Sequence, residues 1–182
     1  MLLDAAAAVA TLLHPRSVAI VGASEDTGKF GGRAFHLLLR HRFAGEVYPV
    51  NPNRPELLGL KAYPSVAALP AAPEVAVLAI PRQHLRRAVE ECAAVGVRAA
   101  IVITSQFAET GEQGARDERE LVAIAHAGGM RLLGPNCLGL FSPANGVVLS
   151  TSPALDIDTL NVGQVGMVSQ SGALMATIFD RA

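Results

Sequence analysis

The chain has 182 residues, of which 51% are hydrophobic, 4% are aromatic and 17% are charged, with a net charge of −1. This length fits one domain with a remainder, since a domain typically has about 100–200 residues. The balanced charge and the absence of a stripe of basic and aromatic residues argue against nucleic-acid binding. No apolar run approaches the roughly 20 residues that a membrane helix needs, so we expect no membrane partner.

The cysteine content points to a reducing compartment. Cys92 and Cys137 provide neither a disulfide framework nor the spacing of a metal site, so we expect a cytoplasmic protein. The apolar segment of residues 1–15 superficially resembles a signal peptide. It lacks a positive beginning, contains Asp4 and leads directly into the first strand, which favours a short leading helix.

The stretch from Ser17 to Arg42 organises the rest of the chain. Ser17–Val21 is an apolar, β-branched run that ends at Gly22, and an amphipathic series follows Gly31 and Gly32. This pattern predicts a strand, a glycine-bearing loop and a helix. Backbone N–H groups and the positive end of the helix dipole meet in such a loop, where a phosphate group can bind.

The loop departs from the dinucleotide fingerprint. That fingerprint has the spacing G-x-G-x-x-G and an acidic residue after the second strand, which binds the ribose hydroxyls. Here Gly22 is followed by Gly28, Gly31 and Gly32 with a longer insert, and the second strand ends in Asn51-Pro52. The loop alone therefore leaves two interpretations open, a phosphate site and a tight structural turn.

Strands and helices then alternate with a period of roughly thirty residues. The later strands are predicted at Glu46–Val50, Val75–Ile80, Arg98–Thr104 and Met130–Leu133, and the later helices at Arg82–Val95 and Ala115–Ala127. Ser65 is expected to cap a single turn over Val66–Leu69, inside a proline-rich connection that is too broken for a long helix. This order predicts an α/β fold, a Rossmann-like doubly wound parallel sheet with right-handed crossovers.

The character of the chain changes near Pro143. We expect the sheet domain to occupy residues 1–145, a linker residues 146–162, and the first βα unit of a flavodoxin-like second domain residues 163–182. In that unit, Val165–Val168 is predicted as a strand, Ser169–Gly172 as a loop and the remainder as a helix. A lone βα unit cannot build its own core, so it either packs on the first domain or begins a longer chain.

Six sequence words occur in order at domain-scale spacing. They are SVAIVGAS with GKFGGRAF, VYPVNPN, AIPRQ, ITSQFAETGEQG, LLGPNCLGL and GQVGMVSQSGAL. From about Leu12 to the C-terminus, the chain resembles the CoA-binding domain and the start of the succinyl-CoA-synthetase-like domain of NDP-forming acyl-CoA synthetases. This family includes ADP-forming acetate–CoA ligase and is related to the succinyl-CoA synthetase alpha chain.

The resemblance implies coenzyme A or an acyl-CoA as the ligand. The missing acidic residue after the second strand fits CoA and is awkward for NAD. The CoA-binding positions implied by the resemblance lie at the carboxyl ends of the strands, and they are Gly22, Ser24, Lys29, Phe30, Gly31, Val50, Asn51, Pro52, Arg54, Ile80, Pro81, Thr104, Ser105, Asn136 and Cys137. The implied phosphate-binding positions are Ser169, Ser171 and Gly172.

Several of these residues also have plain structural interpretations. Lys29 and Arg54 would equally serve as solvated loop residues, and Cys137 as a small packed side chain rather than a reactive thiol. Ser171 would cap a helix without any ligand. Ser105-Gln106 replaces the small-residue pair usual in the family, so a longer Gln106 would either crowd the pantetheine arm of CoA or hydrogen bond to it.

In the family, the reaction passes from acyl-CoA through an acyl phosphate and a phosphohistidine to a nucleoside diphosphate. The resemblance implies an ATP-grasp domain or subunit as partner, with ATP, ADP and Mg²⁺ bound outside this chain, and a homo-oligomer is a further expectation. None of the five histidines stands where the phosphohistidine belongs, so we assign no catalytic residue and expect this chain alone to be inactive. Two other functions stay open, a regulatory CoA-binding domain of a protein lysine acetyltransferase and an NAD(H)-binding sensor or oxidoreductase.

Overall fold

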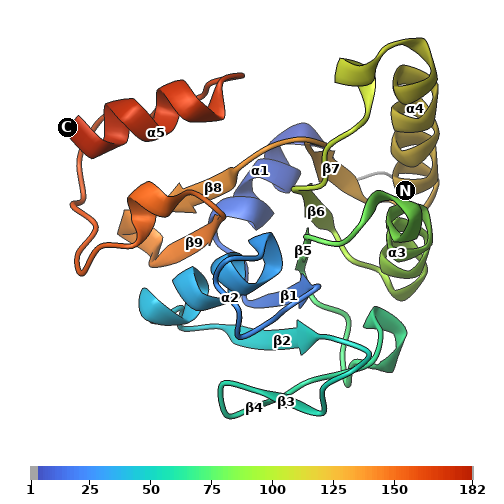
Figure 1. Cartoon of the computed structure of the whole chain (residues 1–182), viewed down its shortest axis with the longest axis horizontal. Helices are drawn as coiled ribbons and strands as arrows, with labels where there is room; N and C mark the ends of the chain where they lie inside the picture. The colour runs from blue at the N-terminus through green and yellow to red at the C-terminus, as the bar shows by residue number, and fades with distance from the viewer. Residues whose placement is uncertain (1–3, 182) are drawn as a thin grey trace.

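A five-stranded parallel sheet forms the centre of the molecule (Figure 1). The structure, a computed structural model, describes residues 4–181. The strands are β1 (Ser17–Val21), β2 (Glu46–Val50), β5 (Val75–Leu78), β6 (Ala99–Val102) and β7 (Arg131–Leu133), in the spatial order β2-β1-β5-β6-β7. All neighbouring pairs are parallel. The predicted Rossmann-like α/β fold is confirmed. Strands β1 and β2 have the predicted bounds, and β5, β6 and β7 are one to three residues shorter than predicted.

Helices cover both faces of this sheet. They are α1 (Ala5–Leu13), α2 (Phe30–Arg40), α3 (Arg82–Val95) and α4 (Glu112–Ala127), followed by α5 (Gly172–Arg181). Alternate strand residues point to opposite faces. Val18 and Ile20 of β1 therefore pack with Phe35 of α2, whereas Ala19 and Val21 belong to the cluster that includes Leu85 of α3. The leading helix is confirmed as α1, although residues 1–3 of that segment lie outside the described residues.

The chain reverses its direction of winding between β1 and β5. From β1 it passes through α2 to the edge strand β2, then returns to β5 and continues outward through α3 to β6. The helices that follow β1 and β5 therefore lie on opposite faces, and a crevice opens between their first turns. Ligands of open α/β sheets bind at this switch point, outside the carboxyl ends of the strands.

Two small hairpins and four short 3₁₀ turns lie outside the sheet. The hairpins pair β3 (Glu56–Leu57) with β4 (Leu60–Lys61) and β8 (Gly139–Ser142) with β9 (Val147–Ser150), and the turns are η1 (Val66–Ala68), η2 (Ala108–Thr110), η3 (Pro143–Asn145) and η4 (Pro153–Leu155). The sequence did not predict either hairpin. The β8–β9 hairpin covers α2, where Leu37 packs with Val148 and Leu155, so α2 is buried between the sheet and the hairpin.

The predicted strand at Val165–Val168 is wrong. No strand forms there, and Val165 and Val168 are 94% and 101% exposed. A β-strand needs a neighbouring strand to satisfy its backbone, and within the described residues this segment pairs with no strand. The helix predicted after it is confirmed as α5, which lies beyond the β8–β9 hairpin and away from the sheet (Figure 1). Residue 182 lies outside the described residues.

Two further local predictions need correction. Helix α4 begins at Glu112, three residues before the predicted start at Ala115. Ser65 occupies the first position before η1, but its side chain makes no capping hydrogen bond. The division at residues 145 and 162 stays a prediction, and β9 beyond residue 145 buries Val147 and Leu149 in the core of the sheet.

Within residues 4–181, no helix is both long enough and apolar enough to cross a membrane.

Candidate functional site

The loop after β1 is held tightly against its neighbours by two glycines. Gly22 has a φ of +91°, and a Cβ there would lie 2.4 Å from the carbonyl oxygen of Ala79. A Cβ on Gly31 would lie 2.0 Å from the carbonyl oxygen of Gly22. Both distances are too short for any side chain, so the first turn of α2 lies directly on the end of β1.

The N-terminus of α2 is open to a ligand. Lys29 precedes the helix and makes no side-chain capping hydrogen bond within the described residues. Its ammonium group is 3.7 Å from Asp26, and its side chain is 70% exposed. Asp26 and Ser24 instead shape the loop, since Asp26 accepts a hydrogen bond from the N–H of Gly28 and Ser24 accepts one from the N–H of Asp26. First-turn N–H groups of α2 and the helix dipole therefore present positive charge without a bound side chain.

A cavity of about 630 Å³ lies at the switch point. Its floor is the carboxyl ends of β1, β5 and β6, and the first turns of α2 and α3 flank it. The residues that line it are Gly22, Gly28, Lys29, Phe30, Gly31, Ala79, Ile80, Pro81, Arg82, Gln83, Ile103, Thr104, Ser105 and Gln106. Eight of the predicted CoA-binding positions are thus brought together in one cavity.

The wall beyond β5 is fixed by hydrogen bonds between loops. The hydroxyl of Thr104 donates to the carbonyl of Ile80 at 2.7 Å, which joins the ends of β5 and β6. Glu109 accepts from the N–H groups of Gln106 and Phe107 at 2.5 and 3.0 Å. Burial alone would raise the pKa of Glu109, but these donors and its own N–H lower it, so the carboxylate stays charged and clamps the loop.

The predicted positions after β2 lie beside this cavity rather than on its lining. The amide of Asn51 donates to the carbonyl of Ala23 at 2.8 Å and its oxygen accepts from the N–H of Asn53, so Asn51 ties the β1 loop to the end of β2. Val50 is buried, and Arg54 is exposed. The position that carries an acid in dinucleotide-binding domains therefore holds a structural amide here.

Asn136 and Cys137 follow β7, next to the loop that carries Thr104. The N–H of Asn136 donates to the carbonyl of Thr104 at 3.0 Å. The Cys137 thiol is half-buried and contacts the carbonyl of Val102 at 3.5 Å, and burial raises its pKa. A thiol in this environment is mostly protonated at neutral pH, which fits the packed interpretation better than the reactive one.

The second predicted anion loop has a different environment. The hydroxyl of Ser171 accepts from the N–H of Leu174 at 3.2 Å and so caps α5. Ser169 donates to the carbonyl of Ser171 and accepts from its N–H. A Cβ on Gly172 would lie 2.7 Å from the side chain of Leu138, so this glycine allows α5 to approach the chain before β8. The capping interpretation is realised in this structure, and phosphate binding stays a prediction.

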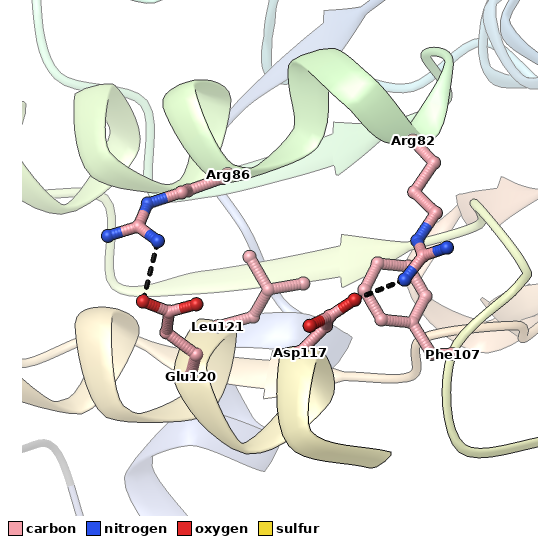
Figure 2. A pocket seen from close by; sticks show the side chains of 6 residues that line it. All are labelled: Arg82, Arg86, Phe107, Asp117, Glu120 and Leu121. Carbon is pink, nitrogen blue, oxygen red and sulfur yellow. Dashed lines mark hydrogen bonds and ion pairs between the residues drawn. The ribbon is translucent and has the colours of Figure 1, made fainter. Parts of the chain in front are cut away.

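A smaller pocket of about 190 Å³ lies between α3 and α4 (Figure 2). Arg82 pairs with Asp117 and Arg86 pairs with Glu120 across it, and the Arg82 guanidinium lies 5.2 Å from the centre of the Phe107 ring. Its charged groups are thus already neutralised by one another. We assign this pocket to helix–helix packing rather than to ligand binding.

Sequence reasoning missed five lining residues, Gly28, Ala79, Arg82, Gln83 and Ile103, whereas Gln106, which the sequence analysis placed next to the pantetheine arm, does line the cavity. Arg82 and Gln83 belong to the first turn of α3, and their position beside a predicted strand end was the available signal. None of the five histidines, all within the described residues, lines the cavity. The described residues also contain no group of three His, Cys, Asp or Glu side chains that could hold a metal ion.

Comparison with known proteins supports the same ligand. Residues 16–143 match the family model described as "CoA binding domain". The chain is 40% identical over 168 residues to the alpha subunit of ADP-forming acetate–CoA ligase II of Pyrococcus furiosus, covering 91% of this chain and 35% of that protein. It is 43% identical over 168 residues to a trans-feruloyl-CoA synthase of an unknown prokaryotic organism, covering 92% of this chain and 24% of that protein.

A solved structure has the same fold. The dinucleotide-forming acetyl-coenzyme A synthetase 1 of Ca. Korarchaeum cryptofilum, in complex with phosphate and ADP, superimposes with a TM-score of 0.88 at 38% identity, covering 95% of this chain and 36% of that one. The chain therefore spans about a third or less of the length of these relatives. The resemblance to NDP-forming acyl-CoA synthetases is confirmed, and the chain belongs to the family of CoA-binding domains, with coenzyme A as its ligand.

Proposed function

We propose that this chain is the CoA-binding part of an NDP-forming acyl-CoA ligase and that CoA binds in the cavity at the switch point. The observation that carries this proposal is the uncapped N-terminus of α2, which opens into a cavity of about 630 Å³ directly over the glycine loop. A diphosphate is the group that such a helix end attracts. The close backbone contacts at Gly22 and Gly31 favour a ligand held by N–H groups rather than by side chains.

The remaining parts of CoA would follow the carboxyl edge in both directions. Lys29 and Ser24 would stand beside the phosphates, and Val50, Asn51, Pro52 and Arg54 would border the adenosine end. The pantetheine arm would lie over Ile80, Pro81, Thr104 and Ser105, with its thiol directed towards Asn136 and Cys137. The apolar side chains of Ile80 and Ile103 suit the hydrocarbon portions of that arm.

The end of β2 favours CoA over a nicotinamide cofactor. NAD-binding domains place a carboxylate there to accept hydrogen bonds from a free ribose diol. Asn51 occupies that position and uses both ends of its amide within the protein. The ribose next to the adenine of CoA carries a 3′-phosphate, so it has no free diol for a carboxylate to bind.

The chemistry of the ligase would require residues beyond those described here. We propose that acyl-CoA, ADP and phosphate are interconverted with carboxylic acid, CoA and ATP through a phosphohistidine outside this chain. A same-enzyme ATP-grasp domain or subunit would bind the nucleotide and Mg²⁺. This assignment is supported by the alpha-subunit relative and by the absence of histidine from the lining of the cavity within residues 4–181. A cytoplasmic location and a phosphate site at Ser169, Ser171 and Gly172 belong to the same proposal.

Titration calorimetry on the 182-residue chain tests the ligand. CoA is expected to bind, dephospho-CoA to bind more weakly if the 3′-phosphate contributes, and NADH to give no heat. Binding of NADH together with no CoA heat would contradict the proposal. Mixing the chain with acetate, CoA and ATP is expected to give no acetyl-CoA, and turnover by the chain alone would place the catalytic residue within it.

A further inference from the structure

Gln106 has a backbone conformation that suits glycine better than glutamine. Its φ is +76°, in the left-handed region that residues with a Cβ disfavour. Arg42, Leu58 and Asn136 are the other described non-glycine residues with positive φ. Among these four, only Gln106 lines the cavity at the switch point.

The loop does not depend on the Gln106 side chain for its shape. Glu109 binds the N–H groups of Gln106 and Phe107, which any residue would supply. A Cβ on Gly114 would lie 1.9 Å from the carbonyl oxygen of Phe107, so the first turn of α4 lies directly against the same loop. A glycine at position 106 would therefore keep these contacts and adopt the observed φ more easily.

The Gln106 carboxamide is available for a ligand. The side chain is exposed, and it makes no hydrogen bond to any residue of the described part of the chain. An amide group both donates and accepts, so it can pair with another amide. The chain thus has an unfavourable φ at a position where the side chain is exposed and makes no hydrogen bond within residues 4–181, a combination found at functional sites.

We propose that Gln106 is a specificity-determining residue that hydrogen bonds to an amide of the pantetheine arm of CoA. The end of β6 is two strand spacings from the end of β1, about 10 Å from the glycine loop. An extended arm that leaves a diphosphate at α2 and passes over Ile80 and Ile103 reaches Gln106 with its amide groups. This inference rests on the proposed function, because it takes the diphosphate to lie at α2.

Two substitutions distinguish the effect of the Gln106 amide group from the effect of the size of its side chain. Gln106→Gly removes the side chain and relieves the positive φ, and Gln106→Met keeps the length but removes the donor and the acceptor. Both are expected to weaken CoA binding about three- to tenfold, the value of one net hydrogen bond. Both should bind adenosine 3′,5′-bisphosphate, which lacks the arm, as well as wild type does. Calorimetry measures each affinity.

Leu58→Gly is the matched control, because it relieves a φ of +48° in the exposed turn of the β3–β4 hairpin. Both glycine variants are expected to melt at the same temperature as wild type or higher, and Leu58→Gly should leave CoA affinity unchanged. CoA binding by Gln106→Gly at wild-type strength would overturn the inference while leaving the proposed function intact. A lower melting temperature for Gln106→Gly would also count against it, since the side chain would then serve the fold. A wild-type chain that binds neither ligand would overturn the proposed function and this inference together.

Discussion

The molecule contains two loops of glycine and serine residues that lead into helices, with similar sequence patterns and different structures. The loop at Gly22–Gly31 follows a central strand of the sheet and precedes a helix without a side-chain cap. The loop at Ser169–Gly172 follows a segment that forms no strand, and Ser171 caps the helix after it. The first opens into a large cavity, whereas the lining of that cavity includes no residue of the second.

This difference shows what a glycine and serine pattern contributes by itself. It permits a tight turn into a helix, but a neighbouring sheet is needed to align several such turns around one hollow. Once the helix N-terminus is capped by its own serine, one of its N–H groups is no longer available for an anion. The same local sequence chemistry therefore gives a binding edge in one place and a helix cap in the other.

Alanine at the last glycine of each loop gives the largest expected contrast. Gly31→Ala places a Cβ against the Gly22 backbone, so we expect the free energy of unfolding to fall by about 1–3 kcal/mol and CoA binding to weaken. Gly172→Ala meets only the Leu138 side chain, which can rotate, so its cost should be smaller. Urea unfolding of both variants measures the two losses. Equal losses would show that the two loops are equally constrained.

Removal of the Ser171 hydroxyl tests the capped loop. Ser171→Ala is expected to destabilise α5 by about 1 kcal/mol, the usual value of a helix N-cap. Hydrogen exchange should report faster exchange in α5 and no change in β1 and β5, because helices at the edge of a fold open locally. Exchange that accelerates throughout the sheet would instead show that α5 unfolds together with the core.

The smallest expected effect is on the pH dependence of stability, and it concerns the ion pair of Arg16 and Glu74. Glu74 precedes β5 and binds the N–H and guanidinium of Arg16, which precedes β1. The hydrogen bond from Arg16 is the main cause that lowers the pKa of Glu74. The folded state then binds fewer protons than the unfolded state, so this stabilisation is present above the ordinary glutamate pKa of about 4.3 and is lost as pH falls below it.

Glu74→Gln should therefore show a shallower loss of stability on acidification than wild type. Thermal unfolding of both proteins from pH 7 down to pH 3 measures the difference in stability. Hydrogen exchange in α5, which does not contain Glu74, is the control and should be the same in both proteins. Identical pH profiles would show that the ion pair of Glu74 with Arg16 does not contribute to the pH dependence of stability.

The parallel sheet could be predicted because its strands are short apolar runs that end at a glycine, a proline or a polar residue. Val75–Leu78 is an example, since every residue in it is buried. The β8–β9 hairpin was missed because its strands contain Gly139, Ser142 and Ser150, and its stability comes from packing on α2 rather than from a local pattern. The strand at Val165–Val168 was predicted from its apolar residues alone, which do not supply a pairing partner.

The site could be predicted where strand ends determine it and not where loops converge. Gly22, Ile80 and Thr104 each follow a strand, so their position at one edge follows from the parallel order. Arg82 and Gln106 line the same cavity because α3 starts immediately after Pro81 and because Glu109 bends the loop after β6. The first cause was visible in the sequence beside a predicted strand end, whereas the hydrogen bonds of Glu109 arise only in the folded loop.

Helix α2 is enclosed on two sides, by the sheet through Phe35 and Leu38 and by the hairpin through Leu37. A helix held in this way cannot recoil or reorient when an anion arrives at its first turn. The conformational entropy of the N-terminus of α2 is thus lost during folding, so ligand binding does not have to order this helix end. We therefore expect the N-terminus of α2 to have the same position with and without a bound anion.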